Sequence, residues 1–119
     1  MPVQANSKVR PRSSSNILIG YQAGIAMGNG AGETPNNNIA IGEEAMRNAG
    51  DVTYNVAVGD HALKEITGFN NTAVGKNALR DNINGDNNIA IGTEAMMDAG
   101  EDGKTVDNNT AMGDAALKS

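Results

Sequence analysis

The segment NNNIAIGEEAM at positions 36–46 recurs almost unchanged as NNIAIGTEAM at positions 87–96. Two related segments lie between these copies, NVAVGDHAL at 55–63 and NTAVGKNAL at 71–79. Six segments share the pattern, and they begin at Asn16, Asn38, Asn55, Asn71, Asn88 and Asn109. The spacings from one asparagine to the next are 22, 17, 16, 17 and 21 residues. Since helical repeats need roughly 33 residues or more, this unit is too short for two helices.

Each unit is typical of one short strand followed by a corner. Ile39 and Ile41 flank Ala40, and the same alternation returns in the other units, with the period and the branched residues of a strand. The glycine after each strand can adopt a positive φ, and the asparagine before it tolerates tight turns. Two short segments and two corners fit in 16–17 residues. The sequence therefore predicts an all-β fold, a parallel β-roll or β-solenoid of about six coils of 16–22 residues.

Stacked coils place like residues above one another at a spacing of about 4.8 Å. We expect the branched residues to point inward, and the asparagines to form an amide ladder of the kind seen in stacked strands. The residues of this predicted internal ladder are Asn38, Ile39, Ile41, Gly42, Asn55, Val56, Val58, Gly59, Asn71, Val74, Gly75, Asn88, Ile89, Ile91 and Gly92.

The constant alanine between the branched residues leaves two interpretations open. The alanine face either lies against water or packs against a neighbouring copy of the chain. We favour the second, because a thin roll with few aromatic residues buries little area and gains a core by oligomerisation, as in a closed trimer. The residues of this predicted trimer face are Ala40, Ala57, Ala73, Ala90 and Ala111.

The composition argues against an enzyme. Aromatic residues make up 3% of the chain, and cysteine and tryptophan are absent from it. His61 is the single histidine, so one chain cannot assemble a metal site of several histidines, and it stands at a variable position of the repeat that is also taken by Gln22, Glu44, Asn77, Glu94 and Ala115. The segment DNINGDNN at 81–88 does not place the ligands of an EF-hand and is typical of a turn. We therefore expect no catalytic residue, no cofactor, no metal and, without a long apolar run, no membrane insertion.

Charge divides the chain, whose net charge is −5, into two parts. Residues 1–15 carry Lys8, Arg10 and Arg12 and no acidic residue, whereas residues 16–119 carry 6 basic and 14 acidic residues. We expect a basic extended arm over 1–15 and a repetitive β-roll domain over 16–119. The arm is either a solvated terminus or an anchor that orders against an acidic partner.

The two ends of the repeat are less regular than its centre. Terminal repeats are atypical because they cap a stack, which accounts for the long first and last spacings. GIAMGNGAG at 24–32 echoes the pattern, either as a displaced strand or as a degenerate coil, and the role of residues 24–37 stays open.

The stretch NTAVGKNALRDNINGDNNIAIGTEAM at 71–96 resembles the repeats of bacteriophage tail-fibre and other virion-surface proteins. It is also similar to the head repeats of trimeric autotransporter adhesins. The resemblance covers residues 16–117 and implies a left-handed parallel β-roll assembled as a homotrimer. Because the coil length is closer to the phage form, and the chain shows no export signal, coiled-coil stalk or membrane anchor, we favour the phage proteins.

Two functions follow as expectations from the resemblance and the repeat. The first is a non-enzymatic structural protein of a phage virion, a short trimeric spike or fibre or a capsid decoration protein, anchored through Lys8, Arg10 and Arg12. Its partners would be further copies of itself and capsid or tail proteins, not nucleic acid, at the virion surface after assembly in the host cytoplasm. The alternative is an adhesin-like binding module that recognises a glycan or protein on the host surface.

Overall fold

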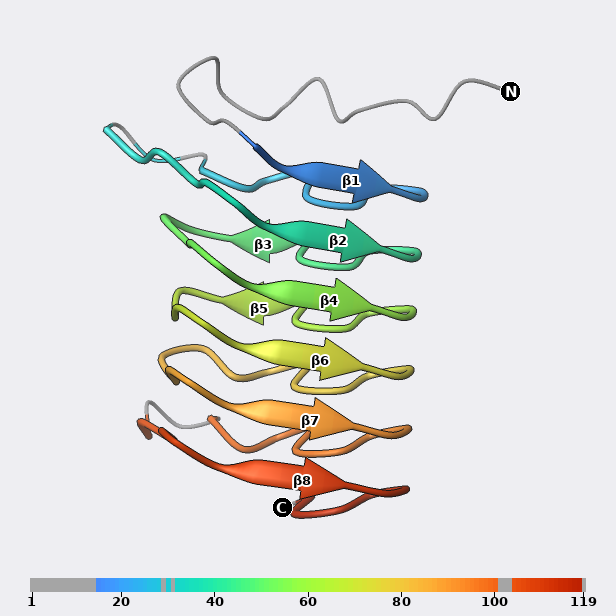
Figure 1. Ribbon diagram of the computed structural model, residues 1–119. Helices are drawn as coiled ribbons and strands as arrows, with labels where there is room; N and C mark the ends of the chain where they lie inside the picture. The colour runs from blue at the N-terminus through green and yellow to red at the C-terminus, as the bar shows by residue number, and fades with distance from the viewer. Residues whose placement is uncertain (1–14, 29, 31, 101–103, 119) are drawn as a thin grey trace.

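The structure is a computed structural model that describes residues 15–28, 30, 32–100 and 104–118. It is an all-β parallel β-solenoid of about four turns with coils of about 17 residues, which confirms this part of the prediction. Figure 1 shows the strands stacked one above another, with short loops at both sides of each coil. The strands are β1 (Ile17–Ile19), β2 (Ile39–Ile41), β3 (Asn48–Ala49), β4 (Val56–Val58), β5 (Glu65–Ile66), β6 (Thr72–Val74), β7 (Ile89–Ile91) and β8 (Thr110–Met112).

The main wall of the solenoid is one parallel sheet with the strand order β1-β2-β4-β6-β7-β8. Its register is uniform, since Ala57 pairs with Ala40 on one side and with Ala73 on the other. A second wall contains the pair β3 and β5, which lies behind the main sheet in Figure 1. Each repeat in the sequence therefore contributes one strand to the same sheet.

The stack has fewer regular turns than the six coils that the repeat count predicts. The chain runs from the end of β1 through residues 20–38 before β2 begins, and in that stretch Asn36 forms an isolated parallel bridge with Thr53. After β8 the structure describes only residues 113–118, which make part of a coil. The first and last strands of the six-stranded main sheet thus lie in irregular or incomplete coils, and the solenoid makes about four turns.

The corners depend on backbone conformations with positive φ. In the coil that begins at Asn38, Gly42 has φ 134°, and Glu44, Met46 and Tyr54 have φ 54°, 50° and 61°. A residue with a side chain adopts this left-handed region at a cost of roughly 1–2 kcal/mol, so contacts between coils must stabilise these corners. The glycine position is the strictest, because a Cβ on Gly42 would lie 2.6 Å from the carbonyl atoms of Gly59 in the next coil.

The strand side chains point the opposite way from the prediction. Ala40, Ala57, Ala73 and Ala90 are 0% exposed and lie inside the coils, and Ala111 is 3% exposed. The branched residues lie on the outside and are half-buried or exposed, so their predicted inward orientation is wrong for Ile39, Ile41, Val56, Val58, Val74, Ile89 and Ile91. The predicted trimer face of Ala40, Ala57, Ala73, Ala90 and Ala111 is also wrong, since these side chains face the interior. A period of two fits either orientation, and the width of the interior decides between them.

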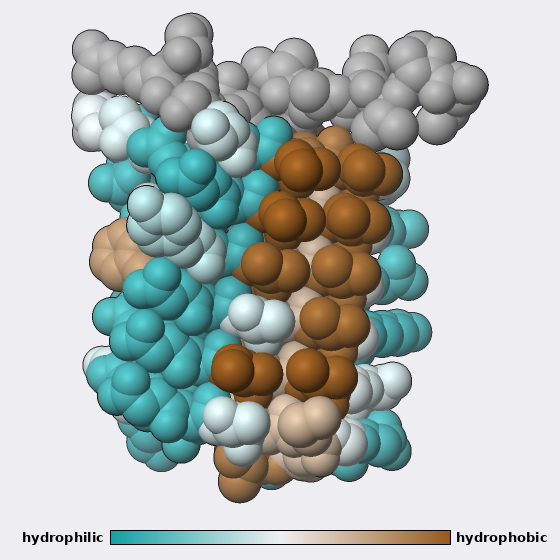
Figure 2. All heavy atoms as spheres, in the orientation of Figure 1, coloured by the Kyte–Doolittle hydropathy of each residue, from teal (hydrophilic) through white to brown (hydrophobic). Residues whose placement is uncertain are grey.

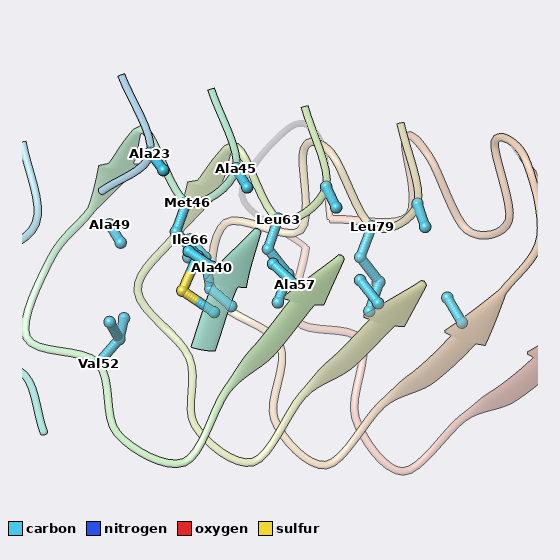
Figure 3. Packing of buried hydrophobic residues seen from close by; sticks show 14 of the residues in the cluster. Ala23, Ala40, Ala45, Met46, Ala49, Val52, Ala57, Leu63, Ile66 and Leu79 are labelled. Carbon is cyan, nitrogen blue, oxygen red and sulfur yellow. The ribbon is translucent and has the colours of Figure 1, made fainter. Parts of the chain in front are cut away.

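That interior is narrow, and in each regular coil a large side chain from the corner lies opposite a small one from the main-sheet strand. In Figure 3, Met46, Leu63 and Leu79 extend from the corner toward the strands, where alanines leave room for them. The first coil exchanges the two sizes: Leu18 takes the alanine position and Gly24 takes the corner position. A Cβ on Gly24 would lie 2.9 Å from Cδ2 of Leu18, so Leu18 occupies the space that the corner side chain fills elsewhere.

The second wall is interrupted at Asn82. Ala49 and Ile66 pair there as interior residues of β3 and β5, and Asn82 follows them at the same position of the next coil. Asn82 is fully buried, its side-chain NH₂ donates to the Gly85 carbonyl at 3.3 Å, and its Oδ1 has no partner in the described part of the chain. Because a buried polar group competes with the strand for hydrogen bonds, the two-stranded sheet ends before this coil.

A column of asparagines joins the coils along one corner. The backbone N–H of Asn55 donates to Oδ1 of Asn38 at 3.0 Å, and the N–H of Asn71 donates to Oδ1 of Asn55 at 2.8 Å. The same bond links Asn38 to Asn16, Asn88 to Asn71 and Asn109 to Asn88. Each side-chain NH₂ also donates within the column or to a nearby carbonyl, for example from Asn71 to Gly85 at 2.7 Å. A buried amide is acceptable here because its donors and acceptors are satisfied.

The exchange of sizes in the first coil predicts coupled effects on stability. Leu18→Ala should lower the free energy of unfolding by about 2–5 kcal/mol because it leaves a cavity. Gly24→Leu alone should also destabilise, by about 1–3 kcal/mol, since it overpacks the space beside Leu18. The double variant recreates the alanine and leucine of the other coils, so its loss in free energy of unfolding should be smaller than the sum of the two single losses. Urea unfolding of the four proteins measures this coupling, and strictly additive effects would contradict the exchange.

Candidate interaction surface

The outward branched residues form an apolar stripe along the main sheet. Figure 2 shows it as two brown columns that run down the sheet, broken by a few paler residues. We use the name outer stripe for the first and third residues of the main-sheet strands: Ile17, Ile19, Ile39, Ile41, Val56, Val58, Thr72, Val74, Ile89, Ile91, Thr110 and Met112. Ile89 and Ile91 are 40% and 37% exposed although they are large and apolar.

The outer stripe is larger and flatter than the scattered apolar residues of an ordinary surface. Six strands about 4.8 Å apart span about 29 Å, and two columns about 7 Å apart span about 11 Å when the width of their side chains is included, so the area is on the order of 300 Å². The largest contiguous apolar patch on a typical soluble monomer is of this size and is often functional. Polar residues rim it on both sides, with Asn70 and Asn87 before the strands and Glu43 and Asp60 after them, all exposed. An apolar centre with a polar rim is the usual anatomy of a protein interface.

This surface differs from the prediction from sequence, in which the same residues lie inside. Thr72 and Thr110 occupy positions of the predicted inward column, and Met112 replaces a branched residue there. A polar hydroxyl is poorly tolerated in a narrow apolar interior, whereas the outside accepts it. The alanine position varies less, since only Leu18 departs from alanine. The greater variation at the first and third strand positions was the sequence signal that these positions lie on the outer face.

A cluster of charged side chains lies at the corner that follows the main-sheet strands. The Glu44 carboxylate accepts from Lys64 Nζ at 3.1 Å and lies 3.2 Å from His61 Nε2. The hydrogen bond from Lys64 lowers the pKa of Glu44 from its ordinary value of 4.5. Farther along the stack, the hydrogen bond from Lys118 lowers the pKa of Glu94 and raises that of Lys118. These pairs link consecutive coils, and the imidazole of the single histidine lies against one of them.

One open pocket of about 400 Å³ lies beside β3, and Glu33 is the only acidic or basic residue in its lining. The Glu33 carboxylate already accepts from the backbone N–H of Gly30 at 2.8 Å. Within the described ranges, no three residues of the His, Cys, Asp and Glu types gather as a metal site, and no helix is long and apolar enough to span a membrane.

The predicted site residues divide into three groups. Lys8, Arg10 and Arg12 of the predicted arm lie outside the described residues. The asparagines and glycines of the predicted ladder stack from coil to coil along the corners. The branched residues come together on the outer stripe, and the alanines lie inside the coils.

No family model matches the chain, and no curated protein or solved structure matches it either. The fold assignment therefore depends on the strand pairing and burial described above. The outer stripe is the feature from which a function can be argued.

The ion pairs between coils predict an acid-labile contribution to stability. Because the folded-state pKa values of Glu44 and Glu94 are lowered from 4.5, their contribution is present above that pH and is lost as the pH falls through the lowered values. Replacing both residues by glutamine should lower the urea midpoint at neutral pH and have little effect at about pH 3. Equal losses at both pH values would contradict this assignment.

Proposed function

We propose that the chain is a non-enzymatic structural protein of a phage virion, a short trimeric spike or fibre or a capsid decoration protein. The observation that supports it best is the outer stripe, which runs the length of the main sheet. A protein built to project from a particle needs a stiff body and a face for self-association, and this solenoid offers both. The repeat, which resembles those of phage fibre proteins, supplies the virion context of the proposal.

Three copies can bury the outer stripe by placing it toward a common axis parallel to the stack. In that arrangement Ile89 and Ile91 of each copy meet the same residues of two neighbours at the same height. The polar rim, including Asn87 and Thr93, stays at the outside of each contact. Burial of about 300 Å² of apolar surface per chain is worth roughly 7 kcal/mol at 25 cal/mol per Å², before the cost of association. Ser15 of all three copies then lies at one end of the assembly, which is compatible with anchoring through the residues before it, and a left-handed coil is the form that the resemblance implies.

An adhesin-like role is the alternative, and two exposed aromatic residues favour it. Tyr54 and Phe69 lie on successive coils, whose backbones are joined there by the bond from Asn70 N–H to the Thr53 carbonyl at 3.2 Å. Exposed aromatic rings offer a flat apolar surface with a polar handle on tyrosine, which suits a glycan or a host protein. Binding of the body to host cells, lost when both rings are replaced by alanine, would support this alternative.

A charge on the outer stripe should separate assembly from folding. Ile91→Asp places a carboxylate at the proposed axis, so we expect a folded monomer in place of a trimer. Ile83→Asp is the matched control, because Ile83 is exposed to a similar extent (39% against 37%) but lies outside the stripe. Sedimentation or light scattering gives the mass, and circular dichroism reports the fold.

Ala90→Asp tests the orientation of the same strand. Ala90 is fully buried, so this change puts a charge in the interior and should prevent folding. A folded Ala90→Asp protein, or a trimer that persists in Ile91→Asp, would contradict the proposal.

The anchoring role of the arm predicts a loss of incorporation without a loss of assembly. Reversing the charges of Lys8, Arg10 and Arg12 to glutamate should leave the trimer intact and remove the protein from particles that normally carry it. The measurement is the amount of protein that copurifies with phage particles. Unchanged incorporation would show that these three charges do not anchor the protein.

A further inference from the structure

Among the described residues, the outer edge of the last main-sheet strand has no partner strand. β8 ends the strand order, and the chain beyond it is described only to residue 118. In every earlier coil the equivalent edge is covered by the next coil. An open edge of this kind is a template for another strand.

Three hydrogen bonds recur at each of the five junctions between main-sheet coils. The first strand residue donates its N–H to the next asparagine carbonyl, as Ile89 does to Asn109 at 2.8 Å. The next glycine donates to the carbonyl of the third strand residue, as Gly113 does to Ile91 at 2.8 Å. The next asparagine N–H donates to the asparagine Oδ1, as Asn109 does to Asn88 at 3.0 Å.

The last coil contains the donor or acceptor group for one side of each of these three bonds. The groups in question are Oδ1 of Asn109, the N–H of Thr110 and the carbonyl of Met112, and none of them has a partner among the described residues. Gly113 differs from the preceding corner glycines in the same way, because no atom lies within 4 Å of the position of its Cβ. The Gly92 position, one coil earlier, is covered by the Gly113 carbonyl.

Apolar side chains are exposed at the same edge. Met112 and Leu117 are 69% and 61% exposed, although Met96, the equivalent of Leu117 one coil earlier, is buried. Leu117 therefore marks an interior that is open at this end. Another coil placed on this edge would close it.

We propose that this edge, defined by Asn109, Thr110, Met112, Gly113 and Leu117, binds the first coil of a second copy of the chain. That coil begins NILIG at Asn16 and contains the groups that complete the three bonds, namely the N–H and carbonyl of Asn16 and the N–H of Gly20. None of these groups has a hydrogen-bond partner among the described residues. The register is the one that all five internal junctions share.

The charges at the two ends are compatible with this junction. Inside the stack, an acidic residue at one corner position pairs with a basic residue of the next coil, as Glu94 does with Lys118. In the proposed junction, Ala115 of one copy takes the acidic position and Ile25 of the other copy takes the basic position. That corner position then holds no unpaired charge, so the two ends match there in polarity as well as in hydrogen bonding.

The proposed contact is head-to-tail. A head-to-tail contact that does not close into a ring produces an open filament. This axial contact is independent of the outer stripe, which lies on the side of the rod. The axial contact can therefore be tested whether or not the lateral contact exists. If the lateral contact exists, the filament grows by addition of trimers, and if it does not, the filament grows by addition of single chains.

Thr110→Pro tests the edge with little change inside the molecule, since it removes an N–H that donates to no described residue. Thr110→Val is the matched control, because it keeps the N–H and the branched shape. We expect the unchanged chain and Thr110→Val to increase in mean mass with concentration, at least twofold over a hundredfold range, by light scattering. Thr110→Pro should keep a constant mass and the same circular dichroism.

A mixing experiment distinguishes head-to-tail growth from a contact between two identical ends. Thr110→Pro keeps its first coil, so a minority of it should bind to growing ends and shorten the assemblies of the unchanged chain, as seen by electron microscopy. If Thr110→Pro does not fold, Leu117→Glu serves in its place, since that exposed side chain would put a charge on the same edge. A mass that is constant with concentration for the unchanged chain, growth that persists in both edge variants, or assemblies that stop at two units would each overturn the proposal.

Discussion

The narrow interior of the coil is the constraint on which the rest of the structure depends. A coil of about 17 residues encloses little space, so the strand side chain and the corner side chain that meet inside it cannot both be large. Met46 opposite Ala40 satisfies this limit, and Leu18 opposite Gly24 satisfies it with the sizes exchanged. Because the interior cannot take the branched residues as well, these are placed on the outer face. The apolar surface of the protein is thus a consequence of how little its interior holds.

The coils are joined by polar groups to a degree that is unusual for an interior. Asn55 and Asn71 are fully buried, yet each bonds to the coil on either side through its backbone and side chain. The column tolerates burial because its donors and acceptors are satisfied, and that requires asparagine at the same position in every coil. Glycine is likewise required at the next corner, because a Cβ on Gly59 would lie 2.6 Å from the Gly75 carbonyl oxygen. These two columns hold the coils in register, while the interior side chains supply apolar burial.

Such a stack has two kinds of surface with different chemistry. Its side offers the outer stripe, where association would bury apolar atoms such as those of Ile89 and Ile91. Its end offers backbone groups such as the Thr110 N–H, where association would add hydrogen bonds in a fixed register. The first kind favours closed assemblies around the rod, and the second favours extension along it. Both follow from one repeated coil, since every copy of the coil is a potential neighbour for another.

The sequence by itself determined the repeat, the strands and the columns of asparagine and glycine. Alternation at Ile39–Ile41 predicts a strand, and constant Asn and Gly at its two ends predict corners, since both signals are local. The sequence did not determine which side of the strand faces inward, because a period of two is the same in either orientation. Only the tertiary structure decided that Ala40 is inside and Ile39 outside, since the width of the coil depends on residues such as Met46 that come later in the chain. The open edge at Thr110 was likewise decided by the tertiary structure, because an unpaired N–H is defined by what the rest of the chain leaves uncovered.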